Sequence, residues 1–156
     1  MMVIRSNLHG DVDELVIDWK LVDAIVRHCA AALPNEGCGL LAGRLDGRSL
    51  IADRFFPGTN LLASPSRFAM DPAEVMAALT AIERDGGRLV AIVHSHPATE
   101  ATPSRTDLRE AYYPEALLLI VSLAGDVPCP RAWRLSAGSG AEPGVAEVPI
   151  RVGALR

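Results

Sequence analysis

Apolar residues recur along this chain at the spacing of two amphipathic helices. In the first helix, apolar side chains follow one another at steps of four, three and four residues, which places them on one face. These residues are Val22, Val26, Cys29 and Leu33. Asp18 is a suitable N-cap for this helix, and Pro34 ends it. A second helix should begin at Asp71-Pro72 and end at Gly86-Gly87. Its predicted buried face consists of Val75, Leu79 and Ile82.

Shorter apolar or alternating runs between and after these helices have the length of β-strands. The predicted strands are residues 14–17, 36–43, 49–56, 88–93, 117–122, 131–135 and 145–148. Asp46-Gly47 indicates a hairpin turn between two of them. Residues 117–122 are almost continuously apolar, which is typical of a strand covered on both faces. The first dozen residues read as a loosely held arm, and residues 137–144 as a turn. Strands and helices that mix in this order predict an α/β fold.

One predicted strand runs directly into the sequence His94-Ser95-His96-Pro97. Side chains two residues apart in a strand point to the same side, with Cα atoms about 6.6 Å apart, so both imidazoles can reach one ion. Pro97 lacks the N–H that a strand interior needs and therefore turns the chain, which lets Asp107 return as a third ligand. Two His and one carboxylate would leave a tetrahedral ion one open position, the arrangement of a catalytic zinc site.

Each of these residues also has a simpler interpretation. A histidine near a strand is more often a hydrogen-bonded packing residue than a metal ligand. Ser104 and Asp107 form the Ser-x-x-Asp pattern of a helix N-terminal cap. The two interpretations of this pair are compatible, because Ser104 can start a helix whose first turn presents Asp107.

The arrangement His94-x-His96-x7-Ser104-x2-Asp107, with Glu36 upstream, resembles the JAMM motif of the JAB1/MPN/Mov34 metalloprotease family. The resemblance implies one Zn²⁺ per chain, bound by His94, His96 and Asp107. It also implies that Glu36 is the general base and that Ser104 stabilises the oxyanion. The implied architecture is an α/β single domain, a curved mixed β-sheet flanked by helices in the cytidine-deaminase-like manner, with the first helix on one side and the second on the other.

The same resemblance implies a substrate. Short prokaryotic members of this family are similar to enzymes that cleave after the C-terminal Gly-Gly of a ubiquitin-like or sulfur-carrier protein. We expect such a tail to add to a sheet edge near residues 60–67. The main alternative is a non-catalytic MPN-type interaction scaffold, whose usual mark is the loss of zinc ligands; all of them are present here. A nuclease of the RadC type is a third possibility.

Composition narrows the class of protein further. The 156 residues are 49% hydrophobic, with a mean hydropathy of +0.21, which suits one domain spanning residues 1–156. A net charge of −4 and a pI near 5.5 argue against nucleic acid as a partner. Three scattered cysteines favour a reducing, cytoplasmic location. We expect no signal peptide, because residues 1–5 lack its apolar h-region, and no apolar run approaches the ~20 residues of a membrane span. A homodimer is possible.

Two cysteines and one further histidine need their own interpretation. Cys38 lies close to Glu36 and is best interpreted as a buried thiol that packs beside the site. Cys129 lacks the second cysteine of a Pro-Cys-x-x-Cys deaminase zinc site, which disfavours that chemistry. His28 falls off the apolar face of the first helix and is predicted to lie at the surface.

Overall fold

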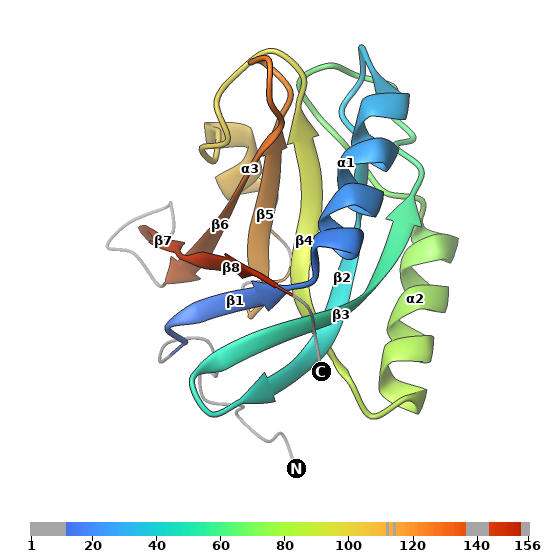
Figure 1. The fold of residues 1–156 in the computed structure, drawn as a ribbon. Coiled ribbons are helices and arrows are strands. Elements are labelled where there is room, and N and C mark those ends of the chain that lie inside the picture. Colours follow the sequence, from blue (N-terminus) through green and yellow to red (C-terminus); the bar gives the residue numbers. More distant parts are fainter. Residues whose placement is uncertain (1–11, 112, 114, 137–143, 154–156) are drawn as a thin grey trace.

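The computed structural model describes residues 12–111, 113, 115–136 and 144–153, which form a sheet of eight strands with three helices (Figure 1). The predicted N-terminal arm and most of the 137–144 turn lie outside these residues. In chain order the elements are β1 Glu14–Ile17, α1 Trp19–Ala32, β2 Cys38–Asp46, β3 Ser49–Gly58, α2 Pro72–Arg84, β4 Arg88–His96, α3 Arg105–Arg109, β5 Leu117–Ser122, β6 Cys129–Ser136, β7 Gly144–Val148 and β8 Ile150–Val152.

The sheet is mixed and strongly curved, as the family resemblance implied. Its strand order is β7-β6-β5-β4-β2-β3-β1-β8, and β4 pairs with β5 in parallel and with β2 antiparallel. The two outermost strands, β7 and β8, are consecutive in the chain and separated only by Pro149. The sheet therefore curls until its two ends approach each other, as Figure 1 shows. The strand β8 was not predicted, because three residues are too few to show a period.

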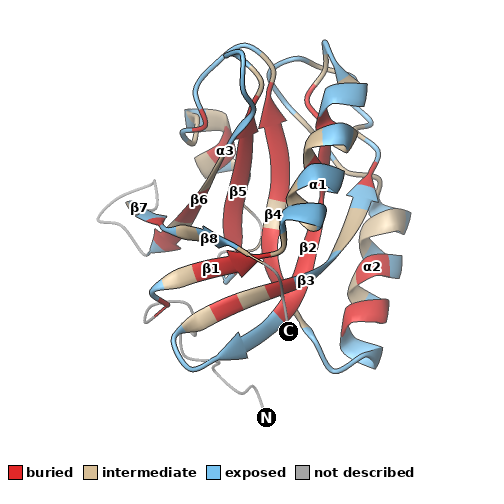
Figure 2. Ribbon diagram, viewed as in Figure 1, coloured by how far each residue is buried: buried red, intermediate tan, exposed pale blue. Residues whose placement is uncertain are grey.

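The central strands are covered on both faces, which explains why β5 is buried throughout and β4 is buried from Val90 to His96 except at the half-buried Ile92 (Figure 2). On one face, Ile25 and Cys29 of α1 pack in a core cluster with Leu41 and Val93. On the other face, Leu108 of α3 packs with a second cluster. That cluster contains Ile92, Leu118 and Ile120, which alternate with residues of the first. Since successive strand residues point to opposite faces, α1 and α3 lie on opposite sides of the sheet. The helix α2 packs against β2, β3 and β4.

Both long helices begin where the sequence predicted. The side chains of Asp18 and Asp71 accept hydrogen bonds from backbone N–H groups of the first turns of α1 and α2. Leu33 was wrongly placed on the buried face of α1: it follows the helix as its C-cap and is 47% exposed. On α2 the buried residues are Ala78, Ala81 and Ile82, while Val75 and Leu79 are half-buried. Among the described residues, no helix has the length and apolar character needed to cross a membrane.

The surface position predicted for His28 is wrong. Its ring is partly buried, and Nε2 lies 2.9 Å from the carbonyl oxygen of Cys38 and 3.1 Å from that of Gly58. Because carbonyl oxygens only accept, Nε2 carries the proton and donates to both. The ring also meets Phe55 edge-on, with centroids 5.6 Å apart. His28 thus ties α1 to the β2–β3 pair.

His28→Ala is expected to lower the free energy of unfolding by about 1–3 kcal/mol, because partly buried carbonyls lose their donor. Chemical denaturation of the metal-free protein measures this loss. Arg27→Ala on the same helix is the control, since it breaks only an exposed pair with Asp23, worth about 0.5 kcal/mol or less. A loss for His28→Ala no larger than that for Arg27→Ala would contradict the bridging role.

Candidate metal centre

Three of the residues singled out from the sequence meet at the end of the central strand. His94 and His96 lie among the last three residues of β4, and Asp107 lies in the first turn of α3. All three residues are buried, and their side chains are 1%, 5% and 5% exposed. Each offers one ligand atom to a common space, and these atoms lie within 4.8 Å of one another. The loop after Pro97 therefore returns α3 to the strand end, as the turn at that proline required.

The three ligand atoms form a nearly equilateral triangle. His94 Nε2 and His96 Nε2 are 3.3 Å apart, and Asp107 Oδ2 is 3.2 Å from the first and 3.1 Å from the second. Two ligands of a tetrahedral zinc ion at about 2.0–2.1 Å lie about 3.3–3.4 Å from each other. The observed triangle is therefore close to the size that one small divalent cation requires. The donor set of two nitrogens and one oxygen also suits zinc.

Ser104 and Asp107 form a helix cap, and the Asp107 carboxylate also faces the two histidines. The Asp107 N–H donates to Ser104 Oγ at 3.0 Å, and the Ser104 N–H donates to Asp107 Oδ2 at 2.8 Å. Asp107 Oδ2 is also the atom that meets the two imidazoles. The cap thus fixes the carboxylate, so the cap interpretation of this pair is confirmed and is compatible with a role for Asp107 as a ligand. Ser104 Oγ accepts in the cap, which leaves its own O–H able to donate to another group.

The two imidazoles are held in different ways. His96 Nδ1 lies 2.6 Å from the carbonyl oxygen of Glu100, so Nδ1 carries a proton and a neutral ring has its lone pair on Nε2. His94 Nδ1 is buried and has no hydrogen-bond partner among the described residues. Its ring instead stacks on Phe68, with centroids 4.8 Å apart and planes 23° apart. Sequence reasoning assigned no role to Phe68, since a single aromatic residue in a loop gives no signal.

Glu36 lies just before β2, not inside the strand as predicted. Hydrogen bonds between Gly37 and Ser95 in both directions hold its backbone against β4, one from Gly37 N–H to Ser95 Oγ at 2.8 Å and one from Ser95 N–H to Gly37 O at 3.0 Å. Since Cys38 pairs with His94, this register brings Glu36 level with His96. The side chain is 3% exposed, and Oε2 has no hydrogen-bond partner within the described part of the chain.

The electrostatics of these carboxyl groups differ. Burial raises the pKa of Glu36 to about 7, and the nearby Asp107 carboxylate adds to this effect. For Asp107, burial acts in the same direction, but the neighbouring imidazoles of His94 and His96 outweigh it and hold the pKa well below its usual range. Glu36 can therefore take up or release a proton near neutral pH, while Asp107 stays ionised. This is the pairing that a base and a metal ligand need.

The raised pKa of Glu36 predicts a pH dependence of stability for the metal-free protein. Between the ordinary pKa of 4.5 and about 7, the folded state keeps a proton that the unfolded state has lost. The free energy of unfolding is thus not reduced by Glu36 below pH 4.5. As the pH rises towards 7 it falls, by up to about 3 kcal/mol. Glu36→Gln removes this decline, whereas Glu83→Gln, on an exposed residue of α2, leaves it in place. Denaturation at pH 5 and pH 7.5 with chelator present measures the difference. An equal change in the free energy of unfolding between pH 5 and pH 7.5 for Glu36→Gln and the wild type would refute this prediction.

Cys38 pairs with His94 between β2 and β4 and therefore lies beside this site. The residue is fully buried, and burial raises the pKa of its thiol to about 12. A group with this pKa is protonated at neutral pH and is neither a nucleophile nor a ready metal ligand.

The segment of residues 60–67, predicted to border the substrate groove, contacts Glu36 directly. The Glu36 N–H donates to the carbonyl of Ser64, and Asn60 Nδ2 donates to the carbonyl of Glu36 at 3.1 Å. Asn60 uses its remaining amide hydrogen and its oxygen to hold the segment's own backbone. At the far end, Arg67 forms an ion pair with Glu110, just after α3. The segment therefore extends from the Glu36 side of the site to the α3 side.

Comparison with known proteins places these features in a family context. Residues 19–136 match the family model described as prokaryotic homologs of the JAB domain. The CysO-cysteine peptidase of Mycobacterium tuberculosis is 40% identical over 121 residues, 78% of this chain and 80% of that protein. The desampylase of Haloferax volcanii is 38% identical over 108 residues, 66% of this chain and 76% of that protein. The probable TtuB-protein conjugate cleaving protease of Thermus thermophilus is 38% identical over 107 residues, 68% of each.

Solved structures agree with the sequence comparison. The solution structure of protein DSY2949 from Desulfitobacterium hafniense superposes with a TM-score of 0.76 at 35% identity and covers 89% of this chain and 92% of that one. A protein from Salinibacter ruber superposes with a TM-score of 0.62 at 30% identity, with coverage of 86% and 90%.

Proposed function

This chain belongs to the prokaryotic JAB family, and from that premise we propose that it is a zinc metallopeptidase acting on a protein conjugate. The proposed reaction is hydrolysis of the amide bond after the C-terminal Gly-Gly of a ubiquitin-like or sulfur-carrier protein. The observation that carries the proposal is the buried triangle of His94, His96 and Asp107 with Glu36 beside it. A non-catalytic scaffold, the alternative, has no need for three ligand atoms to converge at this spacing.

In this mechanism His94, His96 and Asp107 would hold one zinc ion. A zinc ion at such a site supplies a Lewis acid that polarises a carbonyl and makes water more acidic. Glu36 takes the proton from the attacking water and passes it to the leaving amine, and its raised pKa suits both transfers near neutral pH. The free hydroxyl of Ser104 donates to the developing oxyanion, a contact typically worth about 2.7–4 kcal/mol in the transition state.

The substrate class rests on the relatives. The names of two of them, CysO-cysteine peptidase and TtuB-protein conjugate cleaving protease, describe cleavage of a bond to a protein partner, CysO or TtuB. We extend this to a tail ending in Gly-Gly, since a thin extended tail can reach a buried ligand set where a folded surface cannot. The acidic pI of about 5.5 does not suit nucleic acid as the partner.

Cleavage of fusion proteins tests this function. Ubiquitin-like proteins that end in Gly-Gly are extended by a short peptide and incubated with the zinc-loaded protein. The masses of the products are measured by mass spectrometry. The expected product ends at the second Gly, and chelation abolishes its formation until zinc is restored. Tight zinc binding without cleavage of any such fusion would favour the scaffold.

The segment of residues 60–67 provides a separate prediction about where the tail binds. Replacing residues 61–66 with Gly and Ser is expected to weaken tail binding at least about tenfold, or 1.4 kcal/mol, because the segment lies against Glu36. Binding of a Gly-Gly-ended peptide to zinc-loaded Glu36→Gln protein, with and without the replacement, measures this. The same replacement in the exposed residues 124–127 is the control. Equal affinity in all three proteins would show that the tail binds elsewhere.

A further inference from the structure

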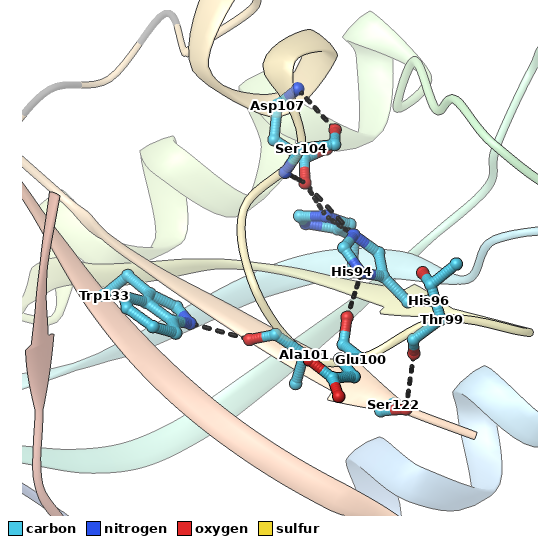
Figure 3. A network of polar contacts seen from close by, with 9 residues as sticks. All are labelled: His94, His96, Thr99, Glu100, Ala101, Ser104, Asp107, Ser122 and Trp133. Atoms are coloured by element: carbon cyan, nitrogen blue, oxygen red, sulfur yellow. Dashed lines mark hydrogen bonds and ion pairs between the residues drawn. The ribbon is translucent and has the colours of Figure 1, made fainter. Parts of the chain in front are cut away.

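Three consecutive backbone carbonyls beside the proposed metal centre each accept a hydrogen bond from a side chain of a different strand (Figure 3). Ser122 Oγ, at the end of β5, donates to the carbonyl of Thr99 at 2.6 Å. His96 Nδ1, at the end of β4, donates to the carbonyl of Glu100 at 2.6 Å. Trp133 Nε1, in β6, donates to the carbonyl of Ala101 at 2.8 Å. The 99–101 segment is thus fixed at three successive points.

The middle of these three bonds fixes the ring of His96. The hydrogen bond that Nδ1 donates sets both the tautomer and the rotation of the ring. It therefore decides where the Nε2 lone pair points. The Glu100 carbonyl is part of a loop outside the sheet and has no strand pairing to hold it. Its position therefore depends on the bonds at Thr99 and Ala101 on either side.

The two outer donors are well placed to hold it. Ser122 is 7% exposed and Trp133 is 8% exposed. Ser122 lies in β5, which pairs directly with β4, and Trp133 lies in β6, which pairs with β5. Ser122 pairs with His96 itself in the β4–β5 ladder. Its Oγ also accepts from the Ala124 N–H at 3.3 Å, which directs its own hydrogen towards Thr99. Both donors are thus fixed by the sheet that carries the metal ligand.

We propose that Ser122 and Trp133 are positioning residues that set the metal affinity of His96 through the 99–101 segment. The inference rests on the proposed zinc function. It does not extend to His94, whose ring has no hydrogen bond at Nδ1 among the described residues and stacks on Phe68 instead.

Zinc affinity tests this inference without reference to catalysis. Ser122→Ala and Trp133→Phe remove one donor each and keep most of the packing volume. Each is expected to raise the zinc dissociation constant about tenfold, the low end of the range for groups that orient a ligand, measured by competition with a chelator. The chain offers matched controls. Ser49→Ala removes a strand hydroxyl that donates to Glu14, and Trp19→Phe changes an exposed indole; both should leave the constant within about twofold of wild type.

A second readout separates positioning from general stability. In an NMR spectrum of the metal-free protein, the His96 Nδ1 proton should move or broaden in Ser122→Ala and Trp133→Phe but not in the controls, and Ser122→Thr should restore both the signal and the affinity. Lower unfolding stability with unchanged zinc affinity and an unchanged His96 signal would overturn the proposal. A wild-type protein that binds no zinc would instead overturn the proposed function, so the two failures are distinguishable.

Discussion

Glu36→Gln is expected to lower kcat/KM for a Gly-Gly fusion by about 10²–10⁴-fold while the protein keeps its zinc. Gln has nearly the shape of Glu but cannot accept a proton, so neither water activation nor protonation of the leaving amine is assisted. The His94, His96 and Asp107 triangle does not include Glu36, and its three ligand atoms should hold the ion unchanged. Turnover measurements on the fusion, with elemental analysis of the same samples, give both quantities.

Glu83→Gln is the control for this change, because Glu83 lies exposed on α2. It should leave both the zinc content and the rate at the wild-type level. If Glu36→Gln cleaved at the wild-type rate with full zinc, Glu36 would not be the base. If it lost zinc, Glu36 would have to be counted among the ligands.

His96→Ala is expected to abolish zinc binding and, with it, hydrolysis. Two remaining ligands cannot hold the ion as three do, and the Glu100 carbonyl loses the donor that it binds at 2.6 Å. Wild-type protein should therefore gain thermal stability when zinc is added, by about 4 kcal/mol at a thousand times the dissociation constant, whereas His96→Ala should gain none. Thermal melts with and without zinc measure the difference.

His28→Ala provides the matched control, since His28 bonds to backbone carbonyl groups and not to the side chains of the proposed metal ligands. It should melt at a lower temperature than wild type but respond to zinc to the same extent. A zinc response that survived in His96→Ala would place the ion outside the proposed triangle.

Local chemistry made the main elements predictable from the sequence. Asp18, Asp71 and Ser104 start helices because their side chains accept from backbone N–H groups that have no partner within the helix. The strand ending in His94 and His96 followed from an apolar run stopped by a proline. The convergence of Asp107 with these histidines needed the family resemblance as well, because spacing alone gave only an unspecified return of the chain.

The sequence gives little sign of the contacts that depend on tertiary structure. The bond from His96 to Glu100 ends on a backbone carbonyl, a group that every residue carries. The bridge from His28 requires the ends of β2 and β3 to lie side by side under α1, and a pattern along one helix does not contain that information. Phe68 stacks on His94 from a loop with no periodicity. Each of these contacts is set by how distant segments pack.

A crystal structure of the zinc-loaded protein, with anomalous data collected at the zinc absorption edge, tests the central claim most directly. We predict one anomalous peak per chain, at about 2.0–2.2 Å from His94 Nε2, His96 Nε2 and Asp107 Oδ2, with no fourth protein atom bound to it. A peak at any other position, or a fourth side chain that completes the coordination and excludes solvent, would contradict a catalytic zinc at this site.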